Sequence, residues 1–168
     1  MPRTFEEASN VESIAQGLIP NYHAELATAR ILYVFSSDCW TKNGRELWGK
    51  VQKFSGFNEW AIEKDFVVMV ALEKWNDLTE PQRTALVDHL LSGCTGEEDE
   101  DTGEYKWKVR DPEVQEFTDV LFRHGVWHEG LRDFVLQAKK VNIEDIVEEE
   151  AEVDLTEGET VNQGEGEG

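Results

Sequence analysis

Three segments of the chain carry the apolar patterns of β-strands. Residues 30–35 (RILYVF) are rich in β-branched and aromatic residues, residues 47–54 (LWGKVQKF) alternate roughly, and residues 66–72 (FVVMVAL) are apolar throughout. A continuous apolar run favours a strand that is buried on both faces. We therefore expect residues 66–72 at the centre of a sheet. Residues 105–109 (YKWKV) alternate and predict a fourth strand.

Helix signals begin near the N-terminus. Thr4, with Glu7 three residues later, has the pattern of a capping box and predicts a helix over residues 4–16. Gly17 would end that helix, and Pro20 would open a second one. Two further amphipathic helices are predicted over residues 111–124, with Gly125 as the C′ residue, and over residues 128–138.

The clearest helix signal is at Thr79. Pro81 lies in the expected first turn, and Gln82 completes a capping box with Thr79. At helical spacing Leu86, His89, Leu90 and Gly93 fall on one face, and Gly93 ends or weakens the helix.

The remaining segments read as connections. Asn43-Gly44 is a strong turn signal, and residues 73–78 and 95–104 are predicted to be loops. Residues 57–63 have no clear pattern. The expected fold is α+β, with a small twisted sheet of three to four strands packed by helices.

Charge divides the chain into two parts. Of its formal net charge of −20, residues 141–168 contribute eleven carboxylates without any Lys or Arg, which leaves about −9 for residues 1–140. We expect one domain over residues 1–140 and an acidic, disordered tail over residues 141–168. This charge argues against direct nucleic-acid binding and favours a basic protein partner.

Other features of the composition indicate a cytoplasmic protein. The start of the chain has no apolar run like that of a signal peptide, and no segment approaches a membrane span. Cys39 and Cys94 are far apart in sequence and form no disulfide framework, which favours a reducing compartment. The oligomeric state is left open by these observations.

Residues 65–94 resemble a known family. The buried strand, the turn and the helix with the segment ALVDH are similar to the core of the putative phage metallopeptidases, a zincin-like family in which that helix continues as the zinc motif HExxH. In the same register this chain reads His89-Leu90-Leu91-Ser92-Gly93. The resemblance implies a zincin-like core and a location in the cytoplasm of a host cell.

The resemblance extends over residues 24–134 and departs from the family again downstream. The family has a helix like HDVEEF, where this chain has Pro112 at the His position and Gln115 at one Glu position. Glu116 and the segment RHGVW at 123–127 match. The family positions that persist are His89, Cys94 and Glu116.

The chemistry of HExxH depends on residues that are missing here. Histidines at i and i+4 share one helical face and can hold one Zn²⁺, and the Glu takes a proton from the bound water. Leu90 has no lone pair for this role, and Gly93 has no ligand atom. We expect no catalytic residue and no cofactor, with His89 as a core or groove histidine. Zinc is expected only if His89, Cys94 and Glu116 form a rebuilt site.

A run of six carboxylates is the candidate partner-binding feature. It could be a solvated loop, a cation site without the regular spacing of a calcium loop, or a surface that binds a basic partner or mimics nucleic acid. The residues are Glu97, Glu98, Asp99, Glu100, Asp101 and Glu104.

Three functions follow from these observations. The first is a catalytically inactive, metallopeptidase-like protein that acts as an acidic binding module. It would serve as an inhibitor or a nucleic-acid mimic directed at a basic host enzyme. An anti-defence role is a further inference from this first function. The second is a zinc metallopeptidase with a shifted ligand set. The third is a structural or assembly component of a phage particle.

Overall fold

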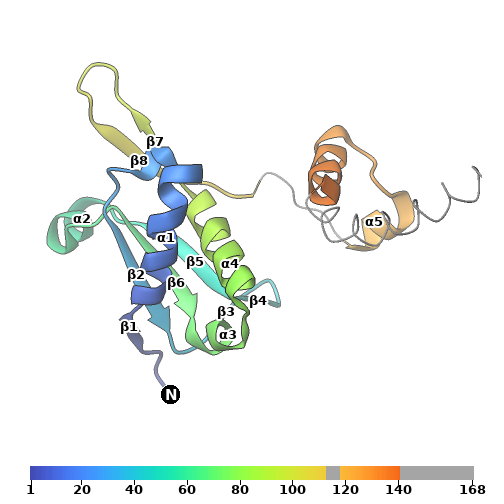
Figure 1. The fold of residues 1–168 in the computed structure, drawn as a ribbon, viewed down its shortest axis with the longest axis horizontal. Coiled ribbons are helices and arrows are strands. Elements are labelled where there is room, and N and C mark those ends of the chain that lie inside the picture. The colour runs from blue at the N-terminus through green and yellow to red at the C-terminus, as the bar shows by residue number, and fades with distance from the viewer. Residues whose placement is uncertain (113–117, 141–168) are drawn as a thin grey trace, which may run out of the picture. The chain divides into compact units, whose positions relative to one another are not determined.

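The computed structural model describes residues 1–112 and 118–140. It divides into two compact units, residues 1–111 and residues 112–168 (Figure 1). The expected domain at 1–140 and tail at 141–168 remain predictions, and the tail lies outside the described residues. Within the described residues, no helix combines the length and apolar character needed to cross a bilayer.

A four-stranded sheet is the centre of the first unit. Its strands lie in the order β1 (Phe5–Glu7), β2 (Ile31–Ser36), β6 (Phe66–Ala71) and β5 (Gly49–Lys53). The two inner strands, β2 and β6, are parallel, and both outer pairs are antiparallel. All six residues of β6 are buried, which confirms the prediction that this apolar run lies inside the sheet.

Two helices cover one face of this sheet. Figure 1 shows α1 (Ser9–Tyr22) and α4 (Glu80–Ser92) side by side across it. Alternate residues of the inner strands face these helices because side chains of a strand alternate between its two faces. The core on this side includes Val11, Ala15 and Leu18 of α1, Tyr33 and Phe35 of β2, Phe66, Val68 and Val70 of β6, and Val87, Leu90 and Leu91 of α4.

A hairpin of β3 (Trp40–Lys42) and β4 (Arg45–Leu47) contributes to the opposite face. Trp40 packs there against Val67, Met69 and Ala71. Asn43 and Gly44, the two residues between the strands, both have positive φ, as a tight hairpin turn requires. The predicted turn is confirmed.

The helix predicted over residues 4–16 is confirmed from Ser9 onward and is wrong before it. Residues 5–7 form β1, and α1 begins only at Ser9, so Thr4 and Glu7 do not form a helix cap. The reason is tertiary, because these residues pair antiparallel with the end of β2. Gly17 and Pro20 lie inside α1 and neither ends nor begins a helix. A short 3-10 helix, η1 (Ala24–Leu26), follows it.

Two segments that were not predicted to be helical form helices. Residues 57–63, which showed no clear pattern, lie mostly in α2 (Gly56–Ile62). The loop predicted over residues 73–78 is wrong, since α3 (Leu72–Asp77) occupies it. Trp75 fixes this short helix on the core, with its ring centroid 5.6 Å from that of Phe35.

The helix signal at Thr79 is confirmed. The Thr79 hydroxyl accepts a hydrogen bond from the backbone N–H of Gln82, and the Gln82 side chain accepts one from the backbone N–H of Thr79. Helix α4 then ends at Gly93, as expected.

A second hairpin replaces part of the predicted acidic loop. Strand β7 (Cys94–Glu98) pairs antiparallel with β8 (Tyr105–Val109), so only residues 99–104 connect them. The predicted strand at residues 105–109 is confirmed. The segment before it is a strand because its backbone pairs with β8, which composition alone does not indicate.

In the second unit, α5 (Thr118–His124) is followed by helical residues 129–140. The backbone N–H of Gly125 donates to the carbonyl of Leu121 with a φ of 61°, which confirms the expected C′ glycine. Residues 113–117, in the first half of the predicted helix at 111–124, lie outside the described residues. The mixed helix and sheet content confirms the expected class, and a zincin-like core remains a prediction.

Candidate functional site

The last turn of α4 holds the positions at which the family resemblance places the zinc motif. Burial on this helix follows Val87, Leu90 and Leu91, whose i, i+3, i+4 spacing faces the sheet. His89 lies off this stripe and is exposed, so it is not a core histidine, and a position in a groove stays a prediction. Its side chain makes no hydrogen bond or ion pair with any other residue in the described part of the chain.

Leu90, at the motif's general-base position, belongs to the core. It is 4% exposed and lies over β5, where a Cβ added to Gly49 would be only 2.7 Å from its Cδ1 atom. This close packing needs a glycine on the strand and an apolar side chain on the helix. A carboxylate here would be removed from water without a partner.

Gly93, at the second-histidine position, is also closely packed. A Cβ at Gly93 would lie 3.1 Å from Cγ2 of Val51 and 3.2 Å from the carbonyl oxygen of Leu90. A ligand side chain would therefore need its neighbours to shift. The residues at 89–93 offer one exposed imidazole and do not fit a catalytic zinc, which usually takes three protein ligands.

Cys94 is 1% exposed, and its thiol lies 3.8 Å from the carbonyl oxygen of Leu90. Burial raises the pKa of Cys94 to about 12. Because zinc binds the thiolate, this environment opposes ligation. Glu116, the third persisting family position, lies outside the described residues.

A different set of potential ligands comes together beside β3 and β4. The ligand atoms of Cys39, Glu46 and Glu73 all lie within 4.8 Å of one another, the single such group of three in the described ranges. Lys74 forms an ion pair with one member of this group, with its Nζ atom 2.9 Å from Glu46 Oε1. Partial burial and the two carboxylates raise the pKa of Cys39 to about 12. The sequence distance between these residues left no spacing signal that could have revealed the group.

His23 and Asp88 form a second pairing that the sequence did not indicate. His23 Nε2 lies 2.6 Å from Asp88 Oδ1, and the His23 side chain is 8% exposed. The contact joins the end of α1 to the middle of α4. Asp88, although next to His89, is thus part of a structural contact.

The base of the β7–β8 hairpin is anchored in the core of the first unit. Trp107 is buried, with its ring centroid 5.7 Å from that of Phe66. Gly96 lies under this ring, and a Cβ there would come within 2.4 Å of Trp107 Cε3. The anchor gives the acidic hairpin a defined place on the domain.

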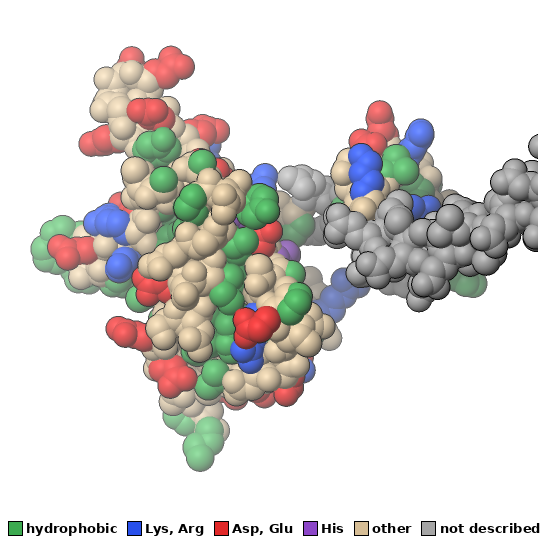
Figure 2. Space-filling model, in the orientation of Figure 1, with side chains coloured by type: hydrophobic (Ala, Val, Ile, Leu, Met, Phe, Trp, Pro, Cys, Tyr) green, Lys and Arg blue, Asp and Glu red, His purple; other side chains and the backbone are tan. Residues whose placement is uncertain are grey.

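The tip of the hairpin carries the predicted partner-binding carboxylates, and Figure 2 shows acidic side chains gathered there. Glu97 pairs with Lys108 and Asp99 with Lys106, at 3.4 and 3.5 Å. The Asp99 carboxylate also accepts the backbone N–H of Asp101. With six carboxylates and two lysines, residues 94–109 have a net charge of −4. Four carboxylates make no ion pair within the described ranges: Glu98, Glu100, Asp101 and Glu104.

Comparison with known proteins identifies a family. A family model described as putative phage metallopeptidase matches residues 3–139, a wider range than the motifs at 24–134 indicated. No curated protein and no solved structure matches the chain.

Proposed function

This chain belongs to the putative phage metallopeptidase family, and we propose that it acts as a binding protein rather than as a peptidase. The observation that carries the proposal is the packing of Leu90 against Gly49. At the position where the family motif has its general base, the chain has a buried leucine that completes the core. Neither proton transfer nor metal ligation is within the chemistry of that side chain.

The acidic hairpin is the surface that we assign to binding. Its base is anchored by Trp107, and four of its carboxylates form no ion pair within the described residues. A surface of this kind complements a basic protein, and complementarity of charge raises the association rate and helps to exclude acidic partners. Residues 141–168 add eleven carboxylates to the same chain.

A basic host enzyme that acts on nucleic acid is the partner class that we favour. Such an enzyme uses Lys and Arg to bind phosphates, and closely spaced carboxylates can occupy the same cations. The cytoplasm of the host cell is the place that this role requires. Inhibition of a host defence enzyme would be one outcome of such binding.

The first experiment measures metal on protein that was purified without chelators or a histidine tag. We expect less than about 0.1 zinc per chain, because three protein ligands are usual for catalytic zinc. Zinc near one per chain would overturn the non-peptidase proposal and favour the shifted ligand set. Loss of that zinc in His89→Ala would place it on α4, and loss in Cys39→Ser would place it at the Cys39 group.

The second experiment tests the hairpin. In the hairpin variant, Gln or Asn replaces the four carboxylates without an ion pair (Glu98→Gln, Glu100→Gln, Asp101→Asn, Glu104→Gln). A control variant makes the same change of charge at exposed positions elsewhere (Glu6→Gln, Glu7→Gln, Glu25→Gln, Asp77→Asn).

Each protein is immobilised and exposed to host-cell lysate over a range of salt concentrations. We expect wild type and control to retain the same basic proteins, the hairpin variant to lose them, and all capture to weaken with salt. Equal loss of captured proteins in both variants would show that net charge alone determines capture. Unchanged capture by the hairpin variant would exclude the hairpin as the binding surface.

A further inference from the structure

Helix α2 belongs to the first unit but buries none of its own residues. It is seven residues long, and Figure 1 shows it at the margin of the unit, away from α1 and α4. Helices this short are unstable in water by themselves, and most of the stability of a protein helix comes from the packing of an apolar face. The side chains of α2 are therefore in a place where a packing partner is expected.

Two aromatic rings form the apolar face of α2. Phe57 and Trp60 are three positions apart, which places them on one face of the helix, and their ring centroids are 5.8 Å apart. The two residues are 75% and 76% exposed. Aromatic residues are enriched in the buried centre of protein interfaces. Phe57 and Trp60, the ring pair, thus form a surface suited to contact with another molecule.

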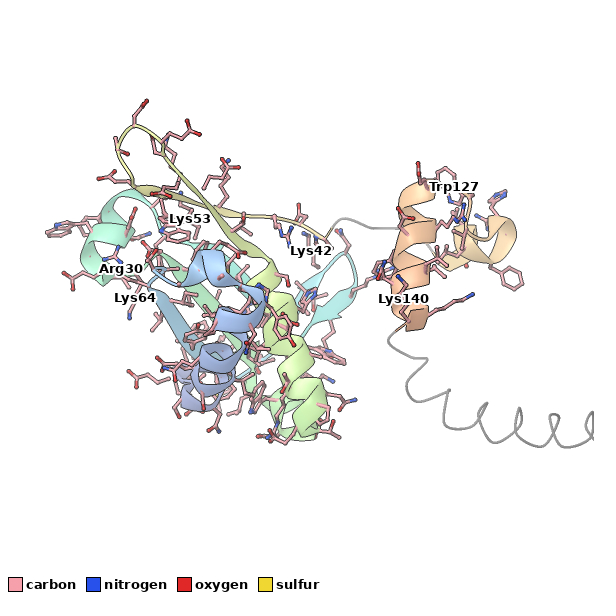
Figure 3. All side chains as sticks on the ribbon, turned by 45° about the horizontal axis from the view of Figure 1, so that its top comes forward. Arg30, Lys42, Lys53, Lys64, Trp127 and Lys140 are labelled. Carbon is pink, nitrogen blue, oxygen red and sulfur yellow. The ribbon has the colours of Figure 1, made fainter. Side chains whose placement is uncertain are left out.

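Three cations lie beside this helix at one end of the sheet. Figure 3 shows Arg30, Lys53 and Lys64 around α2. Backbone hydrogen bonds from Phe54 to Asp65 and from Asp65 to Arg30 hold the three segments side by side. Asp65 Oδ1 lies 3.0 Å from Nη2 of Arg30. Lys53 and Lys64, the unpaired lysines, form no ion pair with any residue that the structure describes.

Two carboxylates at the C-terminal end of α2 lie on the same surface. Glu59 and Glu63, the helix carboxylates, also form no ion pair within the described ranges. The pKa of Arg30 is raised by its hydrogen bond to Asp65 and, less strongly, by Glu59 and Glu63, so these carboxylates lie near the cations. Figure 2 shows hydrophobic, basic and acidic side chains together at this place. Three cations and three carboxylates give the surface no net charge, whereas the chain carries −20.

A second copy of this chain is the partner that such a surface fits. Two copies repel one another through their net negative charge, and the repulsion is least where a neutral surface of each copy meets the other. In a two-fold dimer the same surface of both copies is in contact. The ring pairs can then pack together, while the unpaired lysines of each copy meet the helix carboxylates of the other. The surface is complementary to itself in both shape of charge and apolar character.

The exposed area indicates how strong this contact is. Aromatic side chains bury about 150–250 Å² each, so a ring pair that is three-quarters exposed offers about 300 Å² per copy. Two ring pairs supply about 600 Å², half of the roughly 1,200 Å² at the lower limit of specific interfaces, and the surrounding charged residues supply the rest. An interface of this size belongs at the weak end of the range, with dissociation at micromolar concentrations.

We propose that α2 is the contact of a weak, two-fold dimer of this chain. The ring pair is the centre of the interface, and ion pairs between unpaired lysines and helix carboxylates surround it and fix its orientation. The dimer does not depend on the proposed role of the acidic hairpin, because it involves none of residues 94–109.

Sedimentation velocity of the full chain over micromolar to millimolar concentrations tests the proposal. In the ring variant, Ala replaces both rings (Phe57→Ala, Trp60→Ala). A control variant removes one Phe ring and one Trp ring that are exposed elsewhere (Phe122→Ala, Trp48→Ala). We expect wild type and control to shift from one chain to two as concentration rises, and the ring variant to need at least about tenfold higher concentration. Circular dichroism confirms that each variant is folded.

Exchange of the charges tests the two-fold arrangement. A cationic variant carries Glu59→Lys and Glu63→Lys, and an anionic variant carries Lys53→Glu and Lys64→Glu. Each alone brings like charges together and should stay monomeric, whereas an equal mixture should form a dimer of one copy of each. If net charge alone governed association, the cationic variant would dimerise more readily than wild type, because its net charge is less negative.

Three results would overturn the proposal. A wild-type chain that stays monomeric at millimolar concentration has no such dimer. Equal dimerisation of wild type and ring variant would place the contact elsewhere on the chain. If wild type is monomeric and binds phosphatidylglycerol vesicles while the ring variant does not, the ring pair is a membrane contact and not a contact between copies.

Discussion

The imidazole of His23, at the end of α1, lies 2.6 Å from the carboxylate of Asp88 on α4 (Nε2 to Oδ1). These residues are 65 positions apart, and their contact joins the two helices that cover one face of the sheet. His23 is buried, whereas the Asp88 side chain is 44% exposed. The contact therefore supplies a partner for a buried ring nitrogen.

We expect Asp88→Ala to lower the free energy of unfolding by about 1–3 kcal/mol, since it leaves a buried polar group without its partner. Urea denaturation measures this change. Glu80→Gln is the control, because Glu80 is in an exposed pair with Arg83 on the same helix and should cost less than about 1 kcal/mol. Equal effects of the two substitutions would show that the His23–Asp88 contact does not stabilise the fold.

Leu90 should contribute far more to stability than its neighbour His89. Leu90→Ala should cost about 2–5 kcal/mol, because it leaves a cavity above Gly49. His89→Ala, on the exposed side of the helix, should change stability by less than about 0.5 kcal/mol. Both are measured by urea denaturation.

Restoring the glutamate of the family motif gives a sharper test of the same packing. Leu90→Glu should destabilise the protein at least as much as Leu90→Ala, because it buries a carboxylate among apolar side chains. A Leu90→Glu protein as stable as wild type would mean that this part of the core accepts a charge, and the argument against a catalytic site would fail.

The capping box of α4 predicts the effect of a surface substitution. Thr79→Ala removes the side-chain acceptor of the Gln82 N–H and should cost about 1 kcal/mol by thermal or urea denaturation. Thr84→Ala is matched in chemistry, but Thr84 only bonds back to the carbonyl of Glu80 inside the helix. It should be neutral or slightly stabilising. Similar losses at both positions would contradict a specific role for the cap.

Cys94 predicts how stability depends on pH. Burial raises the pKa of Cys94 from 9.0 to about 12, so above pH 9 the unfolded chain releases the thiol proton while the folded chain keeps it. The contribution of the Cys94 thiol to the free energy of unfolding is complete below pH 9 and is lost as the pH rises towards 12. The stability difference between wild type and Cys94→Ala should therefore narrow between pH 8 and pH 11. A constant difference would show that the pKa of Cys94 is not raised.

Several parts of the fold could be predicted because their causes are local. The capping box at Thr79 involves residues three positions apart, and the Asn43-Gly44 turn depends on backbone conformations that these two residues tolerate. The apolar run of β6 indicates burial on both faces wherever the partner strands come from. The family could also be recognised, because the order of strand, capped helix and RHGVW segment is a pattern along the chain.

The sequence by itself also determined that Leu90 and Gly93 lack the donor atoms of the family's motif, since this follows from residue type. Only the tertiary structure decided the strand at Phe5–Glu7, the exposure of His89 and the Cys39 group. Each depends on residues distant in the chain: β1 forms because β2 offers its edge, and His89 is exposed because Val87, Leu90 and Leu91 face the sheet. Helix periodicity determines which residues share a face, and packing decides which face is buried.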